Sequence, residues 1–137
     1  MATKKIVITR NDYERLDKVL ASAFTRAISD KTSLKDLRGE LDAAKVVESQ
    51  KVPPDVVTMD SIVKLLDLET KEIETYTLVY PEEANIASGK LSILAPIGTA
   101  ILGCRTGDVV RWKVPSGECK MRIEEIVFQP ERETMPT

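Results

Sequence analysis

The sequence contains no histidine, which excludes the commonest general base and every Ser-His-Asp or Cys-His arrangement. Its two cysteines, Cys104 and Cys119, do not form a CxxC pair, so zinc sites of the usual Cys/His kind are also excluded. We interpret both cysteines as small, partly buried hydrophobic residues. Enzyme chemistry would have to use carboxylates, lysine or tyrosine, and we predict no catalytic residue, no metal ligand and no cofactor.

Long apolar segments are absent as well. No run of about 18 apolar residues occurs in the chain, so we expect no membrane-spanning helix and no membrane partner. The first residues, Met1–Lys5, lack the apolar region of a secretory signal, and we expect a cytoplasmic protein. A content of 42% hydrophobic and 31% charged residues is typical of a folded chain, and 137 residues suffice for one domain or two small lobes.

Charge is distributed unevenly along the chain. Residues 1–52 contain 11 lysines and arginines against 8 acids, whereas residues 53–137 contain 9 against 14. The net charge of −2 argues against a dedicated nucleic-acid-binding protein. The opposite balances indicate two parts in different surroundings, and we predict a division into residues 1–52 and 53–137.

Two apolar seams with helical spacing follow a short β-prone run at residues 4–9. The first helix has a candidate cap at Thr9 or Asn11, and the second follows a polar link, where Ser33 and Asp36 resemble a capping box. The seam residues are Tyr13, Leu16, Leu20, Ala23 and Ala27, then Leu34, Leu37, Leu41 and Ala44. We predict that the second helix ends at Lys51–Pro54, because proline removes a donor and restricts the residue before it.

The two seams are of similar length and a short link joins them, which indicates an antiparallel helical hairpin, a short coiled coil. Each helix would span about 16 residues, so the hairpin would project roughly 25 Å. The alternative is that both helices pack onto the core as part of one compact domain.

Beyond the prolines the apolar period changes from helical to twofold. We predict strands at about residues 61–67, 73–80, 90–94, 108–114 and 118–128. In the last strand the alternation slips near Glu124 and Glu125, which indicates a β-bulge. A short helix follows Pro96, because proline suits a first helical turn and Gly103 suits the position after the last. The predicted fold class is α+β: a helical hairpin, then a five-stranded sheet with one short helix.

The segments Leu91–Gly103 and Gly107–Val110 together resemble the C-terminal signature of the Gre transcription elongation factor family. The glycines, Pro96 and Asp108 fall in register with that signature. Val56–Ser61 and Leu78–Pro81 are more similar still to the regulators of nucleoside diphosphate kinase, a branch of the family with a shortened hairpin. The signature covers about residues 53–130, whereas the hairpin matches more in architecture than in sequence.

The resemblance implies an FKBP-like, antiparallel second lobe and docking on core RNA polymerase near its secondary channel. In this family the loop before the short helix helps to form the polymerase contact, which implies the partner-binding residues Leu94, Ala95, Pro96, Ile97 and Gly98. Nucleic acid would be met only indirectly, through the polymerase complex, and we expect no small-molecule substrate. The alternative for these five residues is that they cap the helix and fill the core.

The hairpin tip, Ser29, Asp30, Lys31 and Thr32, decides between a cleavage factor and a non-catalytic regulator. Gre factors hold a magnesium ion with acids at this tip, and a hard cation requires carboxylate oxygens. The segment from Arg26 to Arg38, with both arginines included, contains four basic residues and two acids. We therefore predict a non-catalytic regulator that binds RNA polymerase. The family resemblance implies that it competes with cleavage factors and influences nucleoside diphosphate kinase levels.

Three alternatives stay open. The first is a divergent factor that still stimulates transcript cleavage. The second is an FKBP-type prolyl isomerase, although such enzymes line their pocket with several aromatics and this chain has six in all. The third is an adaptor whose hairpin oligomerises.

Overall fold

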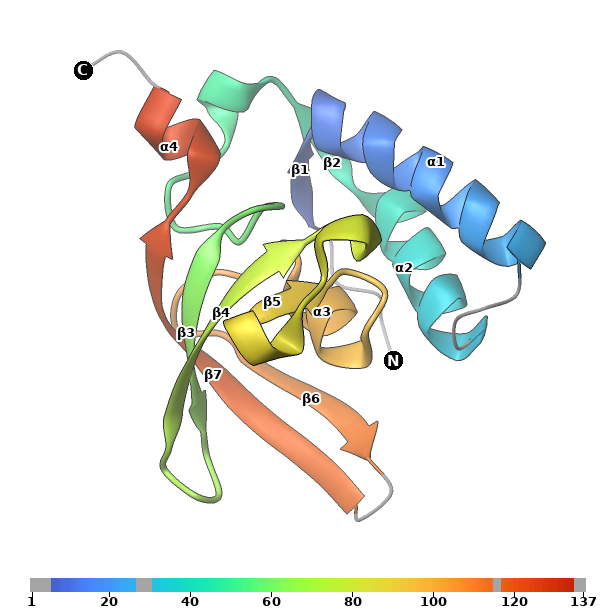
Figure 1. The fold of residues 1–137 in the computed structure, drawn as a ribbon. Coiled ribbons are helices and arrows are strands. Elements are labelled where there is room, and N and C mark those ends of the chain that lie inside the picture. The colour runs from blue at the N-terminus through green and yellow to red at the C-terminus, as the bar shows by residue number, and fades with distance from the viewer. Residues whose placement is uncertain (1–5, 27–30, 115–116, 135–137) are drawn as a thin grey trace.

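The computed structural model describes residues 6–26, 31–114 and 117–134 (Figure 1). The N-terminal part contains β1 (Val7–Thr9), α1 (Arg10–Arg26), α2 (Lys31–Ala43), β2 (Lys45–Val47) and the short helix η1 (Ser49–Lys51). The second part contains β3 (Ile62–Asp67), β4 (Ile73–Val79), η2 (Pro81–Glu83), η3 (Ile86–Ser88), β5 (Lys90–Ser92), α3 (Pro96–Ile101), β6 (Val109–Val114), β7 (Gly117–Phe128) and α4 (Pro130–Thr134). This mixed α+β architecture confirms the predicted fold class.

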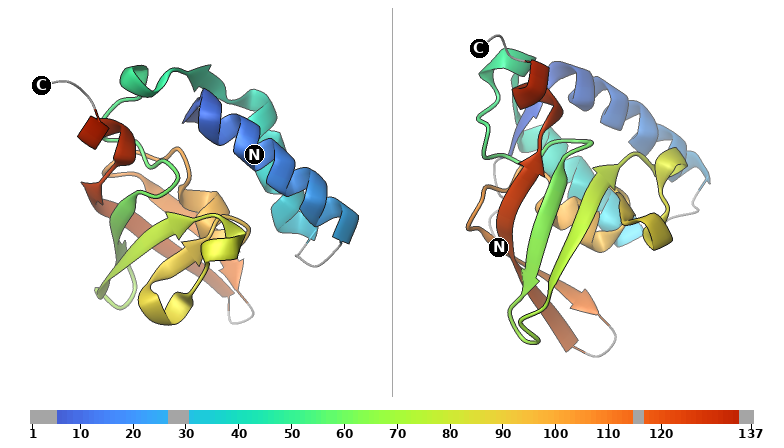
Figure 2. Two further views of the ribbon diagram at one scale, coloured as in Figure 1. Left: turned by 45° about the horizontal axis from the view of Figure 1, so that its top comes forward. Right: turned by 60° about the vertical axis from the view of Figure 1, so that its left-hand side comes forward.

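The helical hairpin lies beside the sheet, and α3 lies between α2 and β6 (Figures 1 and 2). Thr9 caps α1, because its Oγ1 accepts the backbone N–H of Asp12 at 3.1 Å. Among the predicted seam residues whose side chains are described, Leu16, Leu20, Leu34, Leu37 and Leu41 are at most 1% exposed, whereas Tyr13 and Ala44 are partly buried. The side chains of Ala23 and Ala27 lie outside the described residues. Arg38 joins the two helices at the surface, 2.6 Å from Asp17 and 3.1 Å from Asp42.

Both predicted ends of the second helix are wrong. The helix begins at Lys31, so Ser33 lies inside its first turn and is not its cap. It ends at Ala43, well before the prolines, because the following residues form β2 and pair in parallel with β1. The backbone N–H of Lys45 donates to the carbonyl of Ile6 at 2.8 Å, and Val46 and Val47 suit an extended ladder.

The five-stranded sheet has the order β5-β4-β3-β7-β6. All of its pairs are antiparallel except the edge pair β4–β5, which is parallel. The predicted bulge is confirmed, because Lys64 pairs with Glu125 while Leu65 pairs with Ile123, which leaves Glu124 extra. A second bulge leaves Val127 extra in the same way and was not predicted.

The buried side chains of both parts form one hydrophobic cluster, which runs from Leu37 of the hairpin to Leu65 of the sheet. The two parts approach each other closely at Gly103, whose φ is +78°. A Cβ placed on this glycine would lie 2.3 Å from the Cβ of Ile6, which is fully buried. The N-terminal segment therefore packs directly against the second part. The division into residues 1–52 and 53–137 stays a prediction.

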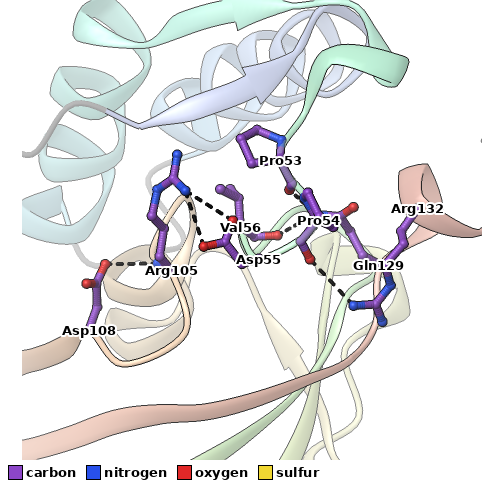
Figure 3. A network of polar contacts seen from close by, with 8 residues as sticks. All are labelled: Pro53, Pro54, Asp55, Val56, Arg105, Asp108, Gln129 and Arg132. Carbon is purple, nitrogen blue, oxygen red and sulfur yellow. Dashed lines mark hydrogen bonds and ion pairs between the residues drawn. The ribbon is translucent and has the colours of Figure 1, made fainter.

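The connection between the two parts, Pro53–Val56, is held by side chains from the end of β7 and from α4 (Figure 3). The fully buried Gln129 donates from Nε2 to the carbonyls of Pro53 (2.9 Å) and Val56 (2.7 Å). Arg132 of α4 donates from Nη1 to the carbonyl of Pro54 at 3.5 Å, while its Nη2 donates to the carbonyls of Ile126 and Val127 in β7 at 3.2 and 3.1 Å. These bonds fix the path of the chain where the hairpin joins the sheet.

Candidate functional site

The five residues predicted to bind a partner form the turn that leads into α3. Ser92 organises the turn: its Oγ accepts the backbone N–H of Leu94 at 3.0 Å and its carbonyl accepts that of Ala95 at 3.1 Å. Ala95 is extended, with φ −72° and ψ 148°, and Pro96 is the first residue of α3. Thr99 fastens the helix back onto the turn, because its Oγ1 donates to the carbonyl of Ile93 at 2.8 Å.

The five residues differ in what they present to solvent. Pro96 is exposed, whereas Leu94, Ala95 and Ile97 are half-buried and pack against the core. Gly98 is buried, and a Cβ there would lie 2.1 Å from the carbonyl oxygen of Ser92. Gly98 therefore permits close approach of α3 to the preceding chain, and Pro96 is the residue of the segment that is most available to a partner.

Two of the four predicted tip residues lie in the part of the chain that the structure describes. Ser29 and Asp30 lie outside the described residues, and Lys31 and Thr32 form the first turn of α2. Asp36 is exposed on the same helix. The 17 residues of α1 correspond to a length of roughly 25 Å, as expected. However, Leu34 is fully buried and α2 contacts α3, so the hairpin lies against the second part along much of its length.

A polar cluster that the sequence did not predict lies where α1 meets the end of β4. The hydroxyl of Tyr80 donates to Asp12 Oδ1 at 3.1 Å. The guanidinium of Arg15 lies 3.7 Å from the centre of the Tyr80 ring, and its Nη2 donates to Glu82 at 2.9 Å. Desolvation, together with the nearby charge of Glu131, raises the pKa of Asp12 to about 6, although the hydrogen bond from Tyr80 opposes the shift.

Glu131 enters this region from α4, and the Thr58–Ser61 turn lies beside it. The Thr58 hydroxyl donates to Glu131 Oε1 at 2.7 Å, and the Ser61 Oγ accepts the Thr58 backbone N–H at 3.0 Å. The remaining residue of the cluster, Asp60, has φ +67°, and burial raises its pKa. No local sequence pattern indicates that acids from α4 and from a turn would meet Asp12 of α1.

Two negative findings hold for the part of the chain that the structure describes. Within it, no three histidine, cysteine, aspartate or glutamate side chains are grouped so that they could hold a metal ion. Its helices include none that is both long enough and apolar enough to cross a membrane.

Similarity to known proteins defines the class. A family model described as "Transcription elongation factor, GreA/GreB, C-term" matches residues 52–128, and one described as "Rnk N-terminus" matches residues 4–47. The two matches cover the sheet part and the hairpin part. The chain belongs to the GreA/GreB family of transcription elongation factors, in the branch that carries the Rnk N-terminus.

Individual relatives agree with both matches. The chain is 36% identical to the regulator of nucleoside diphosphate kinase from Escherichia coli over 96% of this chain and 95% of that protein. It is 38% identical to transcription elongation factor GreA from Desulfotalea psychrophila over 66% of this chain and 56% of that factor. A solved GreA/GreB elongation factor from Nitrosomonas europaea superposes with a TM-score of 0.77 at 38% identity, over 90% of this chain and all of that one. The predicted resemblance is confirmed.

Proposed function

We propose that this protein is a non-catalytic transcription regulator that binds core RNA polymerase near its secondary channel through the turn at residues 94–98. The observation that carries the proposal is the structure of that turn in a member of the Gre family. Pro96 is exposed at the start of α3. The helix behind it is fixed to the preceding chain, because Thr99 donates to the carbonyl of Ile93 and Gly98 packs closely against Ser92. A rigid, apolar projection loses little conformational entropy when a partner covers it.

The absence of catalysis is part of the proposal and rests on charge. The segment from Arg26 to Arg38, with both arginines included, contains four basic residues and two acids. One of those acids, Asp36, is in the second turn of α2. A basic tip repels the divalent cation that a cleavage factor has to hold. The protein would then occupy the polymerase site without acting on the transcript.

Occupancy without cleavage gives the proposed regulatory effect. A protein that fills the site by its sheet part competes with Gre cleavage factors for the same position. The similarity to the E. coli regulator of nucleoside diphosphate kinase supports an influence on the level of that kinase. This influence would be indirect, through transcription.

The test is competition on purified core RNA polymerase. Pro96→Asn should weaken binding about tenfold or more, because interfaces concentrate their energy in a few central anchors and each 1.4 kcal/mol is one decade. Pro130→Asn is the matched control, since Pro130 also opens a helix, α4, at the other end of the sheet part. Lys31→Ala at the start of α2 should change affinity much less.

Binding is measured with and without a Gre factor, and a melting curve for each variant separates lost binding from lost folding. Stalled elongation complexes with the parent protein and magnesium should show no RNA shortening. If folded Pro96→Asn binds like the parent while Lys31→Ala fails, the hairpin carries recognition and the site assignment is wrong. Cleavage that disappears in Asp30→Asn would establish the protein as an active factor instead.

A further inference from the structure

Asp12 is placed unusually for an aspartate in the first turn of a helix. It belongs to α1, but its carboxylate is turned into the contact between the hairpin and the sheet part. Oδ1 accepts the Tyr80 hydroxyl, and the backbone N–H of Met59 faces the same carboxylate. Oδ2 is buried and has no hydrogen-bond partner among the described residues. A buried anionic oxygen without a partner is costly, whereas a protonated one can donate a hydrogen bond.

The charges around Asp12 are mostly of its own sign. From α4, Glu131 is 9% exposed and raises the pKa of Asp12, and Asp60 from the turn before β3 acts in the same direction. On η2, Glu82 and Glu83 face Arg15, the cation of this region, which lies one turn further along α1. The guanidinium of Arg15 is engaged with Glu82 and the Tyr80 ring.

We propose that the base of the hairpin docks on the sheet part with uptake of a proton at Asp12, so that mild acid holds the two parts together more tightly. The geometry supports this coupling because the groups that act on the Asp12 carboxyl all lie on the other side of the contact: Tyr80, Met59, Asp60 and Glu131. Charging the carboxylate therefore weakens the contact between the parts and leaves the interior of each part unchanged. The coupling does not depend on polymerase binding.

The sign of the effect follows from linkage. In the folded protein the pKa of Asp12 is about 6, against an ordinary value of 3.8 for an aspartate in a free chain. Between these values the folded state binds more protons than the unfolded state, so stability falls as pH rises through the window. Glu82 works in the opposite direction, because its own backbone N–H and Arg15 lower its pKa. A comparison with a variant that lacks only the Asp12 carboxylate isolates its contribution.

The experiment is equilibrium denaturation of the full chain at pH 5 and at pH 7.5. For each protein, the folding equilibrium constant at pH 5 is divided by that at pH 7.5. This ratio should be about tenfold larger for the parent than for Asp12→Asn. The amide imitates the protonated acid and should stabilise the protein at pH 7.5. Glu14→Gln, an exposed acid on the same helix, is the matched control and should leave the pH dependence of the parent unchanged. Equal pH dependence of the parent and both variants would overturn the proposal.

Two further measurements use the parent protein alone, so they test the proposal even if Asp12→Asn fails to fold. A carbon NMR titration of the Asp12 carboxyl should show a midpoint near 6, and a midpoint below 4.5 would overturn the proposal. Amide hydrogen exchange, corrected for its intrinsic pH dependence, should show lost protection in α1 between pH 5 and pH 7.5 while β3 and β7 keep theirs. An equal change in all three elements would show a global effect and exclude proton-linked docking.

Discussion

The hairpin and the sheet differ in how far apart in the sequence their contacting segments lie. In the hairpin, α1 and α2 are neighbours in sequence, share a narrow leucine seam and are joined at the surface by Arg38. In the sheet, the central pair β3–β7 brings Ile62 beside Phe128 and needs two bulges to keep its apolar side chains on one face. The hairpin is therefore specified locally by periodicity, whereas the sheet is specified only when distant segments meet.

The contact between these two parts resembles neither the helical seam nor the strand pairing, because individual side chains make it. Ile6 packs against Gly103, the hydroxyl of Tyr80 donates to Asp12, and Arg15 donates to Glu82. None of these contacts belongs to a regular pattern. Each can be changed separately, which allows the two parts to be tested for independence.

The largest effect is expected when the hairpin is removed altogether. We predict that residues 53–137 still fold cooperatively, because most of the described hydrophobic cluster belongs to them. Removal uncovers apolar residues of α3 such as Ile101, so the free energy of unfolding should fall by roughly 3 kcal/mol, about the value of one or two buried aliphatic side chains. Thermal unfolding of the fragment and the full chain measures both quantities. A broad, non-cooperative transition of the fragment would mean that the two parts are one folding unit.

A smaller loss is expected from Gly103→Ala. The methyl group would meet Ile6 at 2.3 Å on a backbone with positive φ, and the two penalties together amount to about 2–4 kcal/mol. Gly107→Ala is the control: its φ is +94°, but no atom lies within 4 Å of the added Cβ. Chemical denaturation gives the free energy of unfolding of each variant, and the difference between the two variants measures the clash with Ile6. An equal loss in both would show that the N-terminal segment does not hold Gly103.

The smallest effect is a gain confined to the hairpin. Gly39 lies inside α2, and a Cβ there would meet no atom within 4 Å. Gly39→Ala should therefore stabilise the protein by about 0.5–1 kcal/mol, since glycine costs backbone entropy in a helix. Denaturation of the full chain measures this gain. A destabilised variant would mean that a segment outside the described residues covers this face of α2.

Periodicity and turn chemistry predicted most of the secondary structure. The seams at Leu16 and Leu37, all five strands and the bulge at Glu124 are confirmed, because each depends on residues close together in sequence. The predicted end of α2 lies too far along the chain, because the prediction depends on Pro53 alone as the signal that ends the helix. Val46 and Val47 compete for an extended conformation, but their partner strand, β1, lies more than thirty residues earlier.

The candidate site was predictable only where a family signature exists. The turn at Pro96 was found by resemblance, and its exposure came from the structure. The cluster around Asp12 had no such signal: its members come from α1, β4, α4 and an irregular turn, and an acid in the first turn of a helix is ordinarily explained by the helix dipole. Burial of that acid depends on tertiary packing, which local sequence does not contain.

The position of β7 has a consequence for how the protein is made. It is the last strand that the structure describes, yet it lies between β3 and β6 in the sheet. During synthesis the helical hairpin can form as soon as residue 43 has left the ribosome, because its partners are already present. The β3–β4 pair has to wait, with one edge open, until Ile126 and Phe128 emerge. For most of translation the nascent chain is thus a finished hairpin attached to an unclosed sheet, whose free β3 edge is its main risk of aggregation.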